Sequence, residues 1–503
     1  MSSKDDAFLE EARLGPRTQA LIDCEEVPHI PRLVRRFREY VLVDLAHAVM
    51  LAETGILSPE RGSALVGALL KIHESKGEGF PWLPDSGSFL VQTEHHLAEN
   101  IGEDIAGRLQ TGRSRNDQSA AADRIFMRDL LLNVMEGTIA LQDAVLAGAD
   151  SHAETLMPGY THLQHAQPTT FGHHLMRYGA AFDRDLGRMA DAYARTNLSS
   201  LGGAAMAGTS WPVDRRRTAE LLGHDDIVVN SSDAGGFARD YIEEVVAVLS
   251  LLMSNLGRLA NDLYVWHSWE FGYLEVADGL AGTSSIMPQK KNPHSLERIK
   301  ALGGQAAGWL PGVMGCQHGI VSTDLDICFA DDLLTGIGDA TLQALRLGTE
   351  TMSTLIVREE RMAEAAGAFW STTSHLADEL VRRYDLPFRA AHHVVGRFVR
   401  DSIAVGRTPG DVRAEDLAEA GEEMAGIKID MSTEELREAL DARAFLSSRR
   451  TEGSVDPAET RKHCVVLGEA LGAHRTEWTA RKAHTNRAVD ALLQRAKEIA
   501  AAE

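Results

Sequence analysis

The sequence predicts an all-α protein with a long central helical bundle. Hydrophobic side chains recur at three- and four-residue spacing almost everywhere, as on one face of an α-helix. Strand-like alternation of Val, Ile, Thr and aromatic residues is rare, and aromatic residues make up only 6% of the chain. A chain of 503 residues can form several domains. We expect an N-terminal helical domain at 1–113, a long-helix bundle at 114–365 and a C-terminal helical domain at 366–503.

Two segments carry the helical pattern over several turns and define the expected bundle. The first contains Met127, Leu131, Val134, Leu141 and Val145, and the second contains Val245, Leu249, Leu252, Leu256, Leu259 and Leu263. The second segment has charged residues only at its ends, so its sides are nearly all apolar. We therefore expect it to lie inside a bundle of other long helices.

Four stretches rich in Gly, Pro, Ser, Asn or Asp interrupt the helical pattern and are expected to be loops. They lie near residues 77–88, 197–213, 276–293 and 405–412. The chain shows no short-period repeat and no low-complexity tract. The expected loops therefore separate long helices rather than repeated units.

Charge and cysteine content narrow the class of protein. Acidic residues outnumber basic ones, 73 against 51, for a net charge of −22. This charge repels nucleic-acid phosphates, and no block of Lys and Arg offsets it. The four cysteines lack CxxC spacing, and the N-terminus has no apolar signal core. The longest uncharged apolar stretch, 245–257, is shorter than the roughly 20 residues that span a membrane. We expect a cytoplasmic protein with neither nucleic-acid nor membrane partners.

Nucleotide and metal sites have no local support in the sequence. There is no GxxxxGK[ST] loop and no strand-GxGxxG-helix unit. Histidines occur in pairs, such as His162 with His165 and His173 with His174. A tight metal site needs further ligands, and no HExxH or Cys/His cluster supplies them. We expect no metal and no cofactor, and we interpret these histidines as solvated or hydrogen-bonded side chains.

The first of three uncommon polar clusters is Thr-Gly-Arg-Ser-Arg-Asn-Asp-Gln at residues 111–118. Guanidinium groups bind carboxylates with paired hydrogen bonds, and Ser and Asn add short donors. The cluster therefore suits a carboxylate ligand. The alternative is a helix-capping and salt-bridge segment before the apolar run at 125–145.

The second cluster is Pro-Gly-Tyr-Thr-His-Leu-Gln-His-Ala-Gln-Pro at residues 158–168. The Thr161 hydroxyl beside the His162 imidazole can bind and protonate an oxyanion or a leaving group. A histidine satisfied within the core is the alternative.

The third cluster is Ala-Gly-Thr-Ser-Ser-Ile-Met-Pro-Gln-Lys-Lys-Asn-Pro at residues 281–293. Its start allows unusual backbone angles and exposed N–H groups, so the loop can close over an anion. Lys290 follows Ser284 by six residues, near enough in a folded-back loop to stabilise a seryl alkoxide or an oxyanion. The alternative is a plain surface loop.

These clusters carry a resemblance to a known family. The third resembles the signature loop of the aspartase/fumarase superfamily, and the first resembles the argininosuccinate lyase branch. The order and separation of all three match that branch over roughly residues 30 to 480. Further matches occur at 207–208, 213–215, 230–234 and 270–272.

The resemblance implies a reaction and a role for each matching residue. The superfamily eliminates an amine or alcohol from a succinyl compound and releases fumarate through an aci-carboxylate. By motif position, the catalytic residues would be the general base Ser284, Lys290, Thr161, His162 and its partner Glu297. The substrate-binding residues would be Ser114, Arg115, Asn116, Gln164, Ser285, Met287, Asn292 and Asp331. The family also implies a homotetramer in which three subunits share each site, and a loop at 281–293 that closes over the ligand.

The chain departs from the branch at positions around the amine half of the site. Ser88-Phe89-Leu90 replaces Asp-x-His, Gln110 replaces a His, and His294 replaces an Asp. Farther along, Thr323, Cys328 and Asp331 replace a Tyr, a Gln and a Lys. The last three changes remove donors for a carboxylate and add an acid, which disfavours a leaving group that bears a carboxylate.

We therefore expect a carbon–nitrogen lyase that reversibly eliminates an amine other than arginine from an N-substituted aspartate. An ethylenediamine-disuccinate lyase is an enzyme of this type. Argininosuccinate lyase is the alternative. A catalytically silent, crystallin-like structural protein is the alternative of another class, and retention of Ser284, Lys290, Asn292, Thr161 and His162 argues against it.

Overall fold

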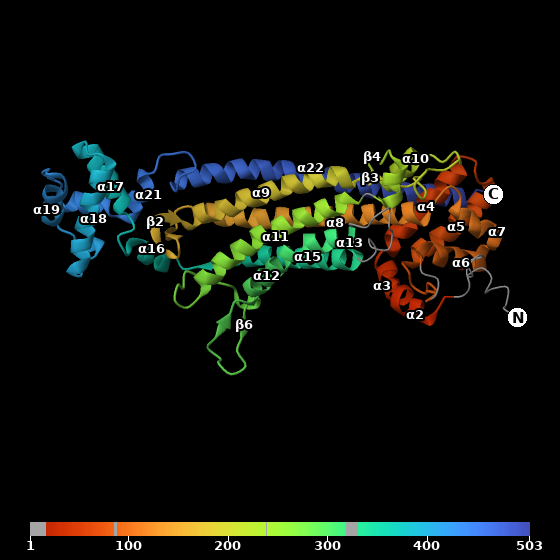
Figure 1. The fold of residues 1–503 in the computed structure, drawn as a ribbon, viewed down its shortest axis with the longest axis horizontal. Helices are drawn as coiled ribbons and strands as arrows, with labels where there is room; N and C mark the ends of the chain where they lie inside the picture. Colours follow the sequence, from red (N-terminus) through yellow and green to blue (C-terminus); the bar gives the residue numbers. More distant parts are fainter. Residues whose placement is uncertain (1–16, 85–87, 238, 318–329, 503) are drawn as a thin grey trace.

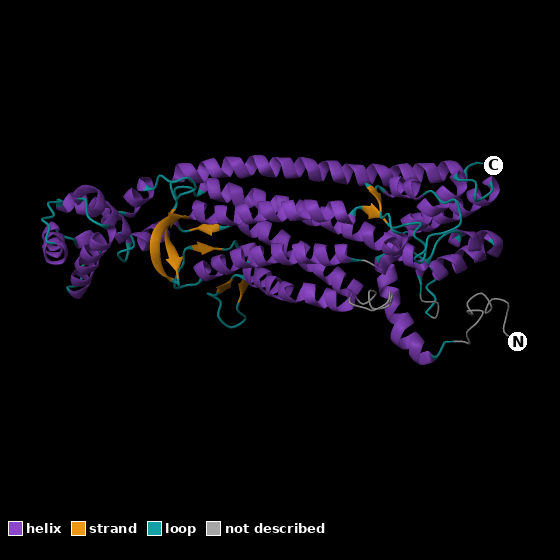
Figure 2. Ribbon diagram, turned by 45° about the horizontal axis from the view of Figure 1, so that its top comes forward, coloured by secondary structure: helices purple, strands orange, loops and turns teal. Residues whose placement is uncertain are grey.

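The computed structural model describes residues 17–84, 88–237, 239–317 and 330–502. The molecule is elongated, with long helices running side by side through its middle (Figure 1). Helices dominate, and the strands are short (Figure 2). The structure is 72% helical, which confirms the all-α prediction.

The central bundle is built from long helices. Its members are α8 (Arg115–Ser151), α9 (Phe171–Thr196), α11 (Asp240–His267), α12 (His294–Gln305), η5 (Ala306–Gly308), α13 (Trp309–Gln317), α15 (Ala330–Ser353) and α22 (Pro457–Ala500). Helix α8 packs against α9, α15 and α22, and α11 packs against α9 and α12. Both long helices predicted from the hydrophobic spacing are present. Along α11 the side chains of Val245, Leu249 and Leu252 are fully buried, as expected for a helix inside a bundle.

One end of the bundle carries the N-terminal helices. They are α2 (Gln19–Leu21), η1 (Ile22–Glu26), α3 (Val27–Arg35), α4 (Phe37–Glu53), α5 (Pro59–Ser75), α6 (Phe89–Ile101), α7 (Glu103–Ala106) and η2 (Gly107–Gln110). Their core includes Leu45, Leu69 and Phe89, together with Leu492 and Ala496 of α22. The last long helix therefore reaches from the bundle into this end of the molecule.

The opposite end carries a small helical group with its own core. It contains α17 (Thr373–Tyr384), α18 (Phe388–Ala404), η6 (Pro409–Asp411), α19 (Ala414–Ala425), α20 (Thr433–Ala439) and α21 (Ala442–Ser448). Leu376, Val394 and Leu436 are fully buried within it. Shorter helices connect the parts: α10 (Arg215–Leu222), η3 (Asp233–Phe237), η4 (Asp278–Leu280) and α16 (Glu359–Gly367). The domain boundaries after residues 113 and 365 stay a prediction.

The strands form two-stranded sheets. Antiparallel pairs join β1 (Leu156–Thr161) to β2 (Gln164–Thr170), β5 (Leu274–Glu275) to β8 (Ile356–Val357), and β6 (Gly282–Thr283) to β7 (Lys291–Asn292); a parallel pair joins β3 (Leu198–Ser199) to β4 (Asp226–Ile227). The β1–β2 hairpin lies at the end of the bundle that faces the small helical group, and the β6–β7 hairpin projects from the side (Figure 1). These two hairpins carry two of the three predicted clusters.

Helix α8 is long and apolar enough, by length and composition, to cross a membrane. Of its most apolar stretch, 61% is buried inside the protein, a property that core helices share. It was the one such helix found in the described part of the chain.

Candidate functional site

The first cluster lies at the start of α8. The Ser114 hydroxyl accepts a hydrogen bond from the Asn116 N–H at 3.3 Å, and the Asp117 carboxylate accepts one from the Ser114 N–H at 2.9 Å. The two side chains form a capping box, so this part of the helix-capping alternative is correct. Arg115 is exposed and Asn116 is half-buried. Both stand at the positive end of the helix dipole, where a carboxylate is stabilised.

A buried polar group supports this helix start from below. Arg113 donates to Asp44 at 2.6 Å, and Gln118 donates to the same carboxylate oxygen at 2.6 Å. The side chains of Arg113 and Asp44 are both inaccessible to solvent. Burial raises the pKa of Asp44, while the Arg113 guanidinium and the Gln118 amide act in the opposite direction. The segment that precedes Ser114 is therefore fixed to α4 by an ion pair. The salt bridge expected under the helix-capping and salt-bridge alternative is thus present.

Asp117 also connects the helix start to the loop after β3. Its second carboxylate oxygen accepts hydrogen bonds from the N–H groups of Gly202 and Ala204, both at 2.9 Å. Burial raises the pKa of Asp117 to about 6, although these backbone donors favour the ionised form.

The second cluster forms the tip of the β1–β2 hairpin. Thr161 pairs with Gln164, and the two residues between them, His162 and Leu163, have φ of 55° and 56°. Positive φ at both central positions is the geometry of a type I′ turn. It costs about 1–3 kcal/mol at a residue other than Gly, and such strain concentrates at functional sites. Thr161, His162 and Gln164 are all exposed, so the core-histidine alternative is wrong for His162.

An aromatic group supports that hairpin. The hydroxyls of Tyr160 and Tyr273 are hydrogen-bonded at 2.5 Å, and the Phe271 ring meets both tyrosine rings edge-on. Tyr273 is buried. The residue immediately before Thr161 is therefore held by a rigid part of the bundle end.

The third cluster is the loop between β6 and β7. The Ser284 hydroxyl accepts hydrogen bonds from the N–H groups of Ile286 at 3.3 Å and Met287 at 3.0 Å. Two N–H groups aimed at one oxygen favour its anionic form. Ser285, Met287 and Lys290 are exposed. The segment lies on the surface, as the alternative of a plain surface loop predicts. A plain surface loop does not, however, require two backbone N–H groups to meet one serine oxygen, as they do here.

Adjacent lysines in this loop have different surroundings. Lys291 makes ion pairs with Glu275 and Asp278, both at 2.6 Å. The side chain of Lys290 makes no hydrogen bond or ion pair with any residue that the structure describes. Lys290 is thus the lysine that is free to meet a ligand.

Asn292 and Glu297 follow the loop. Asn292 lies opposite Gly282 in the β6–β7 pair, and Glu297 stands in the first turn of α12, where it accepts a hydrogen bond from the Tyr264 hydroxyl at 3.3 Å. Within the described residues of one chain, Glu297 makes no hydrogen bond or ion pair with His162.

The first cluster is separated from the other two by most of the length of the bundle. Helix α8 has 37 residues, and a rise of about 1.5 Å per residue makes it about 55 Å long. Ser114 stands at its start, whereas the β1–β2 hairpin follows its end (Figure 1). Thr161 and His162 therefore cannot meet Ser114, Arg115 and Asn116 within one chain.

Comparison with known proteins identifies the family. A model described as lyase matches residues 32–308, and a model described as argininosuccinate lyase C-terminal matches residues 370–447. Argininosuccinate lyase of Methanocaldococcus jannaschii is 37% identical over 458 residues, covering 91% of this chain and 93% of that protein. The chain belongs to the argininosuccinate lyase-like branch of the aspartase/fumarase superfamily. Argininosuccinate lyase of Methanothrix thermoacetophila is 38% identical, with 91% and 92% of the two chains covered.

Solved structures agree with this membership of the branch. EDDS lyase in complex with formate has a TM-score of 0.85 at 31% identity, covering 97% of each chain. The 3-carboxy-cis,cis-muconate lactonizing enzyme of Pseudomonas putida has a TM-score of 0.67 at 19% identity, covering 92% of this chain and all of that one, and shows a shared fold. The resemblance predicted from the three clusters is confirmed.

Several departures from the branch have structural surroundings of their own. Ser88 caps α6 by accepting the Val91 N–H, and Phe89 is buried against the rings of Tyr40 and Phe80. The oxygen of the Gln110 amide is buried without a hydrogen-bond partner in the described residues. His294 lies against Gly282 so closely that a Cβ on that glycine would overlap its ring. At 88 and 90, the branch's Asp and His are thus replaced by a serine that caps a helix and by a buried leucine.

The remaining departures have no described side chains. Thr323 and Cys328 lie outside the described residues. Asp331 lies in the first turn of α15, and its side chain is likewise outside the description. The hypothesis that these positions change the amine specificity stays a prediction.

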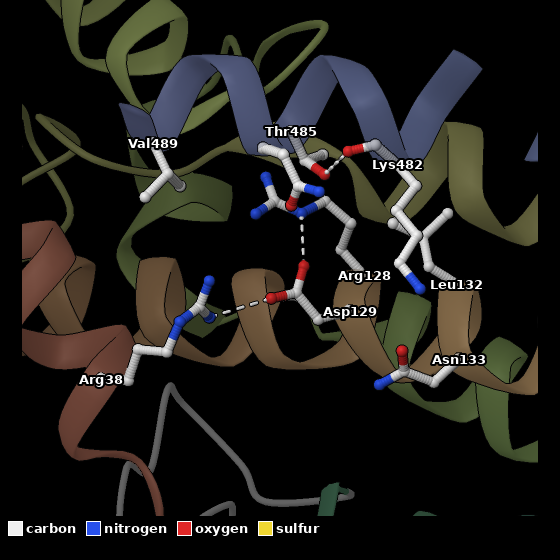
Figure 3. Close-up of a pocket in the computed structure, with 9 residues that line it drawn as sticks. Arg38, Arg128, Asp129, Leu132, Asn133, Lys482, Thr485 and Val489 are labelled. Carbon is white, nitrogen blue, oxygen red and sulfur yellow. Dashed lines mark hydrogen bonds and ion pairs between the residues drawn. The ribbon is translucent and has the colours of Figure 1, made fainter. Parts of the chain in front are cut away.

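Two pockets lie away from all the predicted site residues. One, of about 150 Å³, is lined by residues of α4, α8 and α22. There Asp129 accepts hydrogen bonds from Arg38 at 3.0 Å and Arg128 at 3.1 Å (Figure 3). The bond from Arg38 joins α4 to α8 beneath α22, so this pocket is part of the contact between these helices. The other, of about 820 Å³, lies in the small helical group and is lined by ion-paired residues such as Arg383 and Glu435.

No group of three or more His, Cys, Asp or Glu residues that could hold a metal ion occurs in the described ranges. His173 donates through Nε2 to the carbonyl of Gly453, its Nδ1 shares a hydrogen bond with the Thr169 hydroxyl, and His174 pairs with Asp262. These two histidines are hydrogen-bonded side chains, as expected.

The sequence did not indicate the supports of the three clusters. Asp44 and Tyr273 contact clusters from distant parts of the chain, whereas Glu275 contacts Lys291, which lies 16 residues farther along. Their types are common and their neighbours in sequence are ordinary. Tyr273 and Glu275 lie within three residues of the Glu-Phe-Gly match at 270–272, but that match does not show which residues they contact.

Proposed function

We propose that this protein is a carbon–nitrogen lyase that releases fumarate from an N-substituted aspartate by anti elimination. The observation that carries the proposal is the Ser284 hydroxyl, which faces two backbone N–H groups on a loop that also holds an unpaired lysine. Removing the weakly acidic Cβ proton of a succinyl group requires a strong local base and concentrated positive charge. This loop supplies both.

In the proposed reaction, the Ser284 alkoxide takes the Cβ proton and the electron pair moves into the neighbouring carboxylate. Lys290, Asn292 and the Met287 N–H stabilise the resulting aci-carboxylate. The pair then returns to form the double bond, the Cα–N bond breaks, and the amine leaves with a proton. His162, oriented by Glu297, acts on the leaving-group side. The substrate carboxylates are held by Ser114, Arg115, Asn116, Thr161, Gln164 and Ser285.

Argininosuccinate is the first substrate that we propose. Relatives named argininosuccinate lyase are 37–38% identical over 91% of the chain. This similarity favours argininosuccinate over the substrate expected from the sequence departures, an N-substituted aspartate that carries another amine. The products would be arginine and fumarate.

An N-succinyl amine other than argininosuccinate is the second candidate. The specific observations in its favour are the departures at Ser88, Leu90 and His294, and the acid at Asp331 in place of the branch's lysine. The structural similarity to EDDS lyase, at 31% identity, agrees with this candidate as well.

We further propose a cytoplasmic homotetramer in which three subunits complete each site. The separation of Ser114 from Thr161 by about 55 Å of helix supports a shared site, because one chain cannot assemble it. Symmetric assembly of identical chains brings such distant segments together.

The test is to follow fumarate by its ultraviolet absorbance. Purified protein is given argininosuccinate in one direction, and fumarate with arginine, ammonia or simple diamines in the other. Fumarate release from argininosuccinate would assign the first substrate. Loss of fumarate with a diamine but not with arginine would assign the second. If there is no turnover in either direction, the remaining hypothesis is a catalytically silent, crystallin-like structural protein.

A further inference from the structure

The base of the Ser284 loop is held by a charge cluster that the proposed chemistry does not use. Lys291, in β7, makes 2.6 Å ion pairs with Glu275 of β5 and with Asp278. Glu275 also pairs through its other carboxylate oxygen with Arg358, which follows β8. One carboxylate thus joins the loop to the β5–β8 sheet.

The position of Lys291 makes this contact important for the loop. Lys291 lies directly opposite Thr283 in the β6–β7 pair, and Thr283 immediately precedes Ser284. On the other strand, Lys290 immediately precedes Lys291. Any displacement of Lys291 therefore moves both the proposed base and the proposed cation.

The two acids that hold Lys291 differ in their surroundings. The Glu275 side chain is 25% exposed, whereas that of Asp278 is 97% exposed. Water screens an exposed pair and leaves it little energy, while a partly buried pair is screened less. Glu275 is therefore the acid that fixes Lys291.

The anchor itself is rigid. Leu274 and Glu275 pair with Val357 and Ile356, and the Arg358 N–H donates to the Tyr273 carbonyl at 2.9 Å. Tyr273 is buried and hydrogen-bonded to Tyr160, so Glu275 extends from a segment fixed at several points.

We propose that Glu275 is a positioning residue for the loop that carries Ser284 and Lys290, acting through Lys291. This inference rests on the proposed function for its kinetic consequences. Glu275 touches no reacting atom. It holds the charge of Lys291 at the loop base and leaves Lys290 as the lysine that faces the substrate.

The test compares Glu275→Gln with Asp278→Asn, a matched control that removes the other partner of the same Nζ. We expect Glu275→Gln to lower kcat for fumarate release about tenfold and Asp278→Asn to change it less than about twofold. In a Lys291→Met background, Glu275→Gln should have no further effect, because its action passes through that lysine.

Hydrogen–deuterium exchange provides a readout without substrate. Amides of residues 281–293 should exchange about tenfold faster in Glu275→Gln than in the unmodified protein, with residues 156–170 unchanged in both variants. Equal losses in Glu275→Gln and Asp278→Asn, an undiminished effect in the Lys291→Met background, or unchanged exchange at 281–293 would overturn the inference. If the unmodified protein released no fumarate, the proposed function would fall, and the exchange result would still decide the role of Glu275.

Discussion

Ser284 and Ser285 are neighbours of the same type, and only Ser284 has its hydroxyl facing two backbone N–H groups. We predict that Ser284→Ala lowers kcat about 10³-fold, within the range typical of a lost proton-transfer group. Stability should change by less than about 0.5 kcal/mol, because the side chain lies in a surface loop. Ser285→Ala is the comparison: it should raise KM and leave kcat nearly unchanged, because Ser285 is proposed to hold a substrate carboxylate and not to take the proton. Normal turnover in Ser284→Ala would move the base elsewhere, with Ser285 the first suspect.

His162 offers a substitution that keeps its strained backbone. Its φ of 55° lies in the left-handed region, which Asn adopts more readily than most residues. We therefore predict that His162→Asn preserves the hairpin turn and lowers kcat about 10²-fold with KM nearly unchanged. Steady-state kinetics on argininosuccinate or the identified substrate measures both constants. An unchanged kcat would demote His162 to a structural role.

Residue types in the motifs could be predicted from the sequence, but their partners could not. The two serines of the loop were assigned different roles by motif position alone, and the N–H donors to Ser284 depend on a turn that forms only between β6 and β7. The expected pair of His162 and Glu297 is not formed within the described residues of one chain. Only a structure of the proposed tetramer can test whether the pair forms between subunits. Long-range contacts such as Tyr160 with Tyr273 span 113 residues and leave no local pattern.

Helix α6 contains a carboxyl group that makes stability depend on pH. Burial raises the pKa of Glu94 to about 7, an effect that nearby Asp44 reinforces and Arg113 opposes. The folded protein therefore keeps a proton that the unfolded chain releases above about pH 4.5, so the stabilisation present at low pH is lost as pH rises to about 7. We predict that Glu94→Gln removes this loss and stabilises the protein by about 1–3 kcal/mol at pH 8, with little effect at pH 5.

The measurement for Glu94 is the thermal midpoint of the variant and the unmodified protein between pH 5 and pH 8. The difference between the two midpoints should grow with pH. A constant difference over this range would show that Glu94 titrates as an ordinary exposed carboxyl group.

At the scale of elements, long helices could be predicted and short strands could not. Helices α8 and α11 bury their apolar residues over many turns, so their periodicity is strong. The β6–β7 pair has only two residues in each strand, too few for an alternating pattern. The β1–β2 hairpin turns at His162 and Leu163 instead of the usual Gly or Asn, so the common hairpin signal is missing.

The whole molecule explains why the clusters are so widely spaced in the sequence. Each sits at a break between helices, and a helix of 37 residues separates the first from the second. The order of the clusters could be read from the sequence. Their distribution over different ends of the bundle depends on helix length and direction, which only the structure shows.

A shared site makes a quantitative prediction about mixed assemblies. Asn116→Ala and Ser284→Ala should each be inactive alone, because all four chains then carry the same substitution and every site lacks that side chain. If Asn116 and Ser284 of one site come from different chains, random reassembly of an equal mixture gives each site one intact copy of both with a probability of about one quarter. Mixing the variants in denaturant and refolding them together should therefore restore about 25% of the unmodified activity. Refolding each variant by itself is the control. A mixture that stays inactive would mean that one chain supplies both residues, which would contradict a site divided in this way.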